Sequence, residues 1–490
     1  MTIDFIAIAP EIALTVTALI VLAADLALRG DAKQLVNPIA AIGTLVAIGF
    51  TVFLWGSERV TFGTMFVVDD YAVIFKLLFL GALLAILGIS WRFFAEGRYF
   101  QGEYYFLLLT AFIGMLVMPS ARDLLLLFVA LETVSIPAFV MAGMRKRDLY
   151  SSEAALKFFL IGVLSVALML FGMSMIYGFT GTTDLVGIAA AIEGDVASVP
   201  LLLGSVMLVI VGFGFKISAV PFHFWAPDTY AGAPMPVAAM LAVASKAAGF
   251  AGLISIAFIA FEPVAEVWAP VLGVLAILTM TVGNLIALQQ RDLIRLLAYS
   301  SVAQAGYMLI PFGLARSGAA GVAVNEAAVR AVLFYLVAYA VMNIGAFGVA
   351  IAVNRRTGLR SLRDYAGLSS RSPLLAMGMT VFLLSLGGAP LTVGLWAKFA
   401  ILEAVTVDVT GFGLVLAGFL VINSVIAFFY YLRVVKTIWM DEARAGLPVL
   451  QPGFNLSAVV VILMIGTVVL GVLPGLVTDY SSVVNLLATG

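Results

Sequence analysis

The sequence predicts an all-α polytopic membrane protein with about 14 transmembrane helices. Its 490 residues are 63% hydrophobic and only 11% charged, whereas soluble globular proteins are roughly half apolar and about one quarter charged. A water-soluble core of this size cannot bury so many apolar side chains. Apolar runs of about 20 residues, the length that spans a bilayer as a helix, recur along the chain. The alternation of apolar and polar residues that is typical of membrane barrels is not seen.

Composition excludes several kinds of chemistry. The chain has no cysteine and one histidine, His223, which excludes disulfides, cysteine-ligated iron–sulfur clusters and multi-histidine metal or haem sites. No G-x-G-x-x-G motif follows a strand, so we expect no dinucleotide site. The net charge of −1 gives no reason to expect nucleic acid. We therefore expect no cofactor in this chain.

Fourteen segments fit the length of a membrane span. The first, which begins MTIDFIAIAPEIA, lacks the positive region of a cleavable signal peptide, and we expect it to be retained. The twelfth is too long for one straight helix and contains Gly387, Gly388 and Pro390. The spans lie near residues 5–28, 36–56, 70–91, 103–119, 122–143, 153–178, 201–221, 235–260, 266–288, 293–313, 327–353, 373–404, 411–437 and 457–479.

Positive charges in the loops predict the orientation, because Lys and Arg are retained on the cytoplasmic side. With the N-terminus outside, 17 of the 26 Lys and Arg residues fall in cytoplasmic loops and four in outside loops. The other five are lysines inside spans. This bias supports fourteen spans with both termini outside, in the periplasm.

Several charged residues lie within the predicted spans. Glu132 is at the middle of the fifth, Lys216 is in the inner half of the seventh, and Lys246 is near the middle of the eighth. Lys398 follows the break in the twelfth, and Lys157 is near the start of the sixth. A charge at mid-bilayer costs about 2.5–3.5 kcal/mol on insertion scales, so such residues usually face protein or water.

Two interpretations are open for these charges. Each could be a structural ion pair or a lysine that reaches the interface, above all Lys157 and Lys76, which lie within two turns of a span end. However, one central acid cannot neutralise several lysines. Desolvation disfavours the charged form of a buried lysine and Glu132 favours it in a close partner, so such a lysine can exchange protons near neutral pH. The pattern therefore favours a proton relay.

Helix breaks accompany the three central lysines, in spans 7, 8 and 12. They lie at Pro221, at Gly232–Pro236 and at Pro390. Broken helices at membrane depth are tolerated where protein or water satisfies the freed backbone groups, as in many transporters.

The spans also group into repeats. Spans 4–8 and 9–13 form two blocks of five, and an odd number of crossings gives the blocks opposite orientations, as in inverted-repeat transporters. We therefore expect an N-terminal three-helix segment at 1–102, repeats at 103–260 and 261–437, and a C-terminal loop with helix 14 at 438–490.

Four segments carry a resemblance to a known family. They are GFGFKISAVPFHFWAPDTYAGAPMPV followed by Lys246, DLLLLFVALETVSIP around Glu132, RDLIRLLAYSSVAQAGYM and GGAPLTVGLWAKF. Over nearly the whole chain, the sequence resembles the antiporter-like subunits of proton-pumping NADH:quinone oxidoreductase, respiratory complex I. The stretch Tyr230–Pro234, the lysine in the twelfth span and the absence of a C-terminal lateral helix resemble its subunit N group, which includes mitochondrial subunit 2. The three leading spans are typical of bacterial members.

The resemblance implies a non-redox subunit of the H⁺-translocating NADH:ubiquinone reductase, a translocase of the electron transport chain in the bacterial inner membrane. The implied partners are the other complex I membrane subunits, especially subunits M and K, and membrane lipids. It places NADH, FMN, iron–sulfur clusters and quinone in partner subunits. Protons would pass from cytoplasm to periplasm.

The family's functional residues match positions of this chain one by one. Glu132 matches the acid of the fifth span, which pairs with the lysine of the seventh, Lys216. Lys157 matches the lysine of the sixth span, and Lys246 the central lysine of the eighth. Lys398 matches the lysine of the twelfth, which is expected on the route to the outside.

Two positions and two functional alternatives stay open. Gln304 stands where many relatives have histidine, and it cannot titrate. His223, in PFHFW, fits an interfacial aromatic belt or a role in proton uptake. The alternatives to a proton-pumping subunit are a subunit of an Mrp-type cation/proton antiporter and a non-conducting scaffold of the complex.

Overall fold

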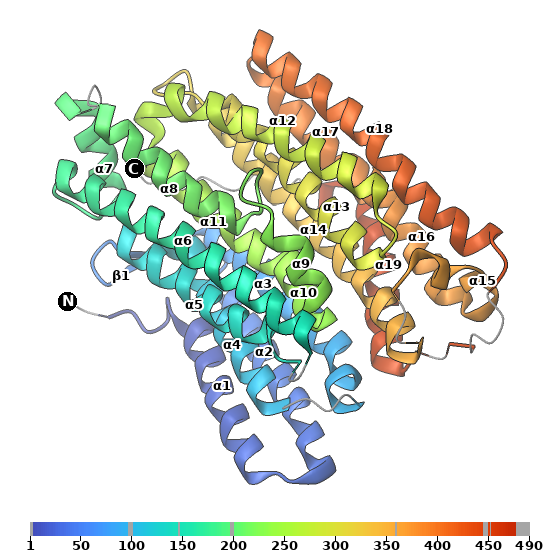
Figure 1. Cartoon of the computed structure of the whole chain (residues 1–490). Helices are drawn as coiled ribbons and strands as arrows, with labels where there is room; N and C mark the ends of the chain where they lie inside the picture. The colour runs from blue at the N-terminus through green and yellow to red at the C-terminus, as the bar shows by residue number, and fades with distance from the viewer. Residues whose placement is uncertain are drawn as a thin grey trace.

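The protein is a bundle of long helices that run in similar directions, with one short hairpin at one end (Figure 1). Within the described residues, twelve helices are long and apolar enough to cross a membrane. The predicted all-α polytopic fold is therefore confirmed. The computed structural model describes residues 3–96, 101–145, 148–196, 200–357, 360–443, 449–450 and 452–476.

Three helices precede the first block: α1 (Ala9–Ala27), α2 (Val36–Phe53) and α3 (Asp70–Glu96). The hairpin of β1 (Arg59–Thr61) and β2 (Phe66–Val68) connects α2 to α3. Helix α1 packs along α2 and α4, which joins this segment to the rest of the bundle.

The first block begins with long helices that pack in pairs, α4 along α5 and α6 along α8. Its eighth span is one continuous segment, Met235–Ala260. The helices of the block are α4 (Gln101–Val117), α5 (Leu124–Ala142), α6 (Leu149–Thr180), α7 (Leu185–Ala191), α8 (Pro200–Lys216), α9 (Trp225–Gly232), α10 (Met235–Met240) and α11 (Lys246–Ser255).

The second block repeats this pairing, with α12 along α13 and α14 against α16 and α17. The last helix, α19 (Phe454–Val472), packs against both α14 and α3. The helices of the block are α12 (Ala265–Gln289), α13 (Leu293–Leu309), α14 (Val322–Thr357), α15 (Leu368–Arg371), α16 (Pro373–Gly387), α17 (Val393–Val407) and α18 (Gly411–Met440).

The predicted seventh and twelfth spans are broken, and each carries its lysine at the break or after it. Helix α8 ends at Lys216, and Ser218 has a φ of 62°. Helix α16 ends at Gly387, Gly388 has a φ of 92° that glycine adopts without strain, and α17 begins only at Val393. These breaks leave helix-end carbonyls inside the bundle.

The eighth span differs in detail from the prediction. The break at Gly232–Pro234 separates α9 from α10, but the span itself is continuous. It contains a π-helical turn, Leu241–Ser245, directly before Lys246. Such wide turns are frequent at functional sites.

Each of the two blocks contains a short antiparallel backbone pairing at the start of a helix, which we call a clasp. In the first, Asp123 caps α5, and the backbone around it pairs with the segment at Asp184. In the second, Asp292 caps α13 and pairs with Ser361. The hydrogen bonds match as well, Leu124 N to Thr183 O at 2.9 Å and Leu293 N to Arg360 O at 3.0 Å.

The clasps lie five crossings apart, so they lie at opposite ends of the bundle. In Figure 1, α7 follows the first clasp at one end, and α15 follows the second at the other. This is the geometry of inverted repeats. Four loop cations that predict the orientation, Arg98, Lys146, Arg147 and Arg444, lie outside the described residues, as do residues 1–2 and 477–490.

Candidate functional site

Lys216 lies at the C-terminal end of α8, and its side chain is only 4% exposed. Its ammonium donates a hydrogen bond to Ser135 Oγ of α5 at 3.0 Å. The position suits a cation, because the C-terminal end of a helix carries partial negative charge. The partner is nevertheless a neutral hydroxyl and not the carboxylate of Glu132.

Glu132 lies one turn before Ser135 on α5 and is half-buried. Its Oε1 atom is buried without a hydrogen-bond partner. Among the described residues, this carboxyl group and the Lys216 ammonium make no ion pair within 4 Å. The acid and the lysine that the sequence predicts to pair are thus neighbours that do not touch.

Lys246 begins α11 and is 1% exposed. Its ammonium donates to Ser301 O at 2.7 Å and to Ser301 Oγ at 2.9 Å. Ser301 lies on α13, so this bond joins the first block to the second. Both acceptors are again neutral.

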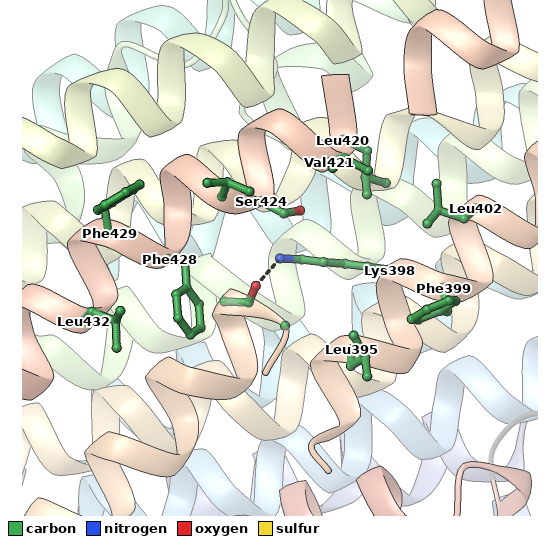
Figure 2. Close-up of a pocket in the computed structure, with 13 residues that line it drawn as sticks. Leu395, Lys398, Phe399, Leu402, Leu420, Val421, Ser424, Phe428, Phe429 and Leu432 are labelled. Atoms are coloured by element: carbon green, nitrogen blue, oxygen red, sulfur yellow. Dashed lines mark hydrogen bonds between the residues drawn. The ribbon is translucent and has the colours of Figure 1, made fainter. Parts of the chain in front are cut away.

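Lys398 lies on α17 with its side chain 5% exposed. Its ammonium donates to the carbonyl of Gly387 at 2.7 Å, which is the open end of α16, and lies 5.3 Å from the centre of the Tyr307 ring. Figure 2 shows the side chain extending from α17 across a pocket to this carbonyl. The helix break therefore supplies the acceptor that the lysine uses.

The pocket around Lys398 has a volume of about 460 Å³ and lies between α17 and α18. Lys398 and Ser424 are the polar side chains that line it, and the others are apolar (Figure 2). Phe399, Val425 and Phe429 line it and are exposed, so the pocket reaches the lateral surface of the bundle.

Polar groups on α13 extend from the surroundings of Lys246 toward those of Lys398. Next to Ser301, the Ser300 hydroxyl lies 2.5 Å from the Tyr431 hydroxyl. One turn on, Gln304 Nε2 donates to the Tyr431 hydroxyl at 3.4 Å and to Leu386 O at 3.3 Å. Leu386 directly precedes the carbonyl that binds Lys398.

Two members of this network were missed by sequence reasoning. Tyr335 donates to Gln304 Oε1 at 2.5 Å, and Tyr431 bonds Ser300, yet both lie in apolar helices as ordinary aromatic residues. The pair Tyr430-Tyr431 inside an apolar span was the available signal, because a buried tyrosine hydroxyl usually needs a partner.

Lys157 lies apart from the buried lysines. Its side chain is 43% exposed, and it pairs with Glu153 and with Asp228 of α9, both at 2.7 Å. Asp228 also binds Arg295 of α13 at 2.9 Å. This cluster of four charges ties α9 to a helix of each block.

His223 lies in the turn between α8 and α9 and is 4% exposed. Its ring packs against Phe224, with centroids 4.5 Å apart. Nδ1 is buried without a hydrogen-bond partner. The ring is therefore enclosed near the break that follows Lys216.

Lys76 differs from the other buried lysines because a carboxylate binds it. It is fully buried and forms an ion pair with Glu11 of α1 at 2.8 Å. Its ammonium also lies 4.9 Å from the centre of the Phe66 ring. This pair connects α1 to α3.

Comparisons with known proteins place this geometry in a family. The family profile described as "NADH:quinone oxidoreductase/Mrp antiporter, TM" matches residues 121–427. The chain belongs to this family. The match contains Glu132, Lys216, Lys246 and Lys398 and leaves out the pair of Lys76 and Glu11.

Relatives place the chain more narrowly, in the subunit N group of these antiporter-like subunits. It is 39% identical to the NADH-quinone oxidoreductase subunit N of Desulforamulus reducens, over 97% of both chains. It is 43% identical to a subunit N of Streptomyces griseus, over 91% of this chain and 84% of that one.

Solved structures of related complexes contain chains with the same fold. A chain of respiratory complex I from Thermus thermophilus superposes with a TM-score of 0.78 at 31% identity, covering 96% of this chain and 98% of that one. A chain of the Mrp complex from Dietzia sp. has a TM-score of 0.81 at 20% identity, covering 98% and 96%. The second likeness shows a shared fold alone.

Proposed function

We propose that this antiporter-like subunit is a proton-translocating membrane-arm subunit of NADH:quinone oxidoreductase, a translocase without redox chemistry of its own. Protons move from the cytoplasm to the periplasm through a relay of Lys216, Lys246 and Lys398, adjusted by Glu132. The observation that carries the proposal is that these three lysines are buried and that each ammonium is bound by neutral oxygens.

Neutral acceptors favour proton transfer. A carboxylate at contact distance stabilises the charged form of a lysine, whereas hydroxyl and carbonyl oxygens stabilise it less. A buried lysine without a contacting carboxylate is therefore poised to release its proton. Lys76, which Glu11 binds, lacks this property and stays outside the relay.

The elements around the lysines support an order of steps for the relay. The Lys216 side chain packs against Gly249 of α11, which lies one turn after Lys246. Between Lys246 and Lys398, α13 carries the polar side chains of Ser301, Ser300 and Gln304. We place proton uptake at the break between α8 and α9, beside His223, and release beyond α17.

The source of energy lies in other subunits. By analogy with the relatives named NADH-quinone oxidoreductase subunit N, we assign NADH, FMN, iron–sulfur clusters and quinone to partner subunits. Subunits M and K are the proposed neighbours. We place the chain in the bacterial inner membrane with both termini in the periplasm.

Replacement of Lys246 tests the function. In inverted vesicles that contain the whole complex, Lys246→Ala should lower both NADH-driven acidification and NADH:quinone turnover at least severalfold, because the link between the two blocks is lost. The control is Lys33→Ala, a 38%-exposed lysine that pairs with Asp25. It should leave both activities unchanged.

The outcomes separate the alternatives. A complex that assembles in normal amount and keeps its turnover and proton yield after Lys246→Ala would be evidence for a scaffold. Co-purification with other antiporter subunits and without a redox arm would be evidence for an Mrp-type antiporter. NADH binding or an iron–sulfur signal from the isolated chain would contradict the proposal.

A further inference from the structure

The hydrogen bonds of Ser135 fix which way its hydroxyl points. Its proton is donated to Leu131 O at 2.7 Å, one turn back on α5. The oxygen is therefore left as an acceptor, and Lys216 Nζ lies 3.0 Å from it. Ser135 can hold an N–H of Lys216 but has no proton of its own to offer.

Glu132 offers the same lysine a second acceptor. It lies three residues before Ser135, and residues at this spacing are neighbours on one helix face. Its Oε1 is buried and without a hydrogen-bond partner. Lys216 therefore has a neutral and an anionic acceptor within one turn of α5, and it uses the neutral one.

Packing on the other side limits where Lys216 can go. A Cβ added to Gly249 would lie 2.9 Å from Lys216 Cγ and 3.2 Å from its Cβ. The aliphatic stem of the lysine thus passes directly over the glycine. With the stem held there, the ammonium reaches α5, where it donates to Ser135.

We propose that Ser135 is a positioning residue that holds the Lys216 ammonium away from the Glu132 carboxyl group. The inference rests on the proposed proton relay and deepens it. Bonded to Ser135, the lysine releases its proton readily. Bonded to Glu132, it retains the proton, because a carboxylate favours the charged form.

Charged and polar groups of four helices in the described part of the chain lie around Lys216. Glu132 faces it from α5 and Lys246 lies on α11, one turn from Gly249. On α6, Lys157 is engaged by Glu153 and Asp228. Helix α12 presents the hydroxyl of Thr279, which accepts from Val220 N at 3.0 Å.

Ser135→Ala in the complete complex tests the proposal. Without the hydroxyl, Glu132 is the acceptor that remains on α5, so the lysine should hold its proton more tightly. We expect the pH profile of NADH:quinone turnover and proton pumping to move to higher pH by roughly one unit, which corresponds to tenfold tighter proton binding. The activity lost at low pH should return as the pH rises.

A matched control and a double variant isolate the cause. Ser205 of α8 is also buried and donates to the carbonyl of Leu201, four residues back, and no lysine of the described residues donates to its hydroxyl. Ser205→Ala should keep the wild-type profile. In a Glu132→Gln background, Ser135→Ala should produce no further shift, because the competing carboxylate is gone.

A volume-matched variant covers the case in which alanine prevents assembly. Ser135→Cys keeps the size of the side chain but offers only a weak acceptor, so its profile should move in the same direction. Profiles of Ser135→Ala or Ser135→Cys that superpose on wild type would overturn the proposal. So would an equal shift with and without Glu132. A failure of the proposed relay itself would give a different result, namely unchanged proton pumping in Lys216→Ala.

Discussion

The buried lysines of this protein differ in what binds them. Lys216, Lys246 and Lys398 are held by hydroxyl and carbonyl oxygens, whereas Lys76 is held by the Glu11 carboxylate at 2.8 Å. A neutral acceptor satisfies the hydrogen bond of the ammonium but stabilises its charge only weakly, whereas a carboxylate satisfies the bond and also stabilises the charge. The difference separates lysines suited to proton transfer from a lysine suited to holding two helices together.

Gly249→Ala, which adds one methyl group, tests whether the position of the Lys216 side chain matters for turnover. The added Cβ would come within 2.9 Å of Lys216 Cγ and of Ile217 Cγ2, so it should displace the lysine and lower turnover severalfold in inverted vesicles. Gly204→Ala is the control, because a Cβ on that glycine of α8 meets no atom within 4 Å. Equal turnover in the two variants would mean that the position of Lys216 does not matter.

The sequence identifies the buried charges but not their acceptors. Charged residues stand out in apolar spans, so Glu132 and the three lysines could be named in advance. Ser135 is 81 residues from Lys216, and Ser301 is 55 residues from Lys246. Serines and backbone carbonyls carry no signal in an apolar helix, so only the packing of the helices reveals these bonds.

At the level of elements, the breaks position the lysines. Helix α8 stops at Lys216, and α16 stops at the carbonyl that Lys398 binds. Gly388 and Pro390 made the second break predictable, because proline lacks an N–H and glycine accepts a positive φ. Helix α9 was not predicted, because an eight-residue helix with Pro227 and Asp228 has the composition of a loop.

The ion pairs of Asp228 should determine how firmly α9 is held. Asp228→Asn weakens its bonds to Lys157 and Arg295. Because these side chains are 32–43% exposed, solvent screens both pairs and each contributes little. Hydrogen exchange of the α9 amides should therefore rise by no more than severalfold.

Glu153→Gln serves as the comparison for this variant. Glu153 is 58% exposed, and its one ion-pair partner among the described residues is Lys157. Both bonds of Asp228 therefore persist in this variant, and exchange in α9 should stay near wild type. Unchanged exchange in Asp228→Asn would show that the cluster does not hold α9, and that other contacts, such as the bond from Arg360 to Ala231 O, are sufficient.

At the level of the whole molecule, two inverted blocks meet along α13. The clasps at Asp123 and Asp292 show the same backbone pairing at opposite ends of the bundle. The bond from Lys246 to Ser301 crosses from one block to the other. The proposed proton path therefore crosses the molecule at the junction of its two repeats.

The path requires water or polar groups in the gaps between its lysines. A high-resolution structure of the whole complex in lipid, with ordered waters assigned, tests this most directly. We predict an unbroken hydrogen-bonded chain from Lys216 through Lys246 and α13 to Lys398. A dry stretch filled by apolar side chains between Lys246 and Lys398, in every state of the working complex, would contradict it.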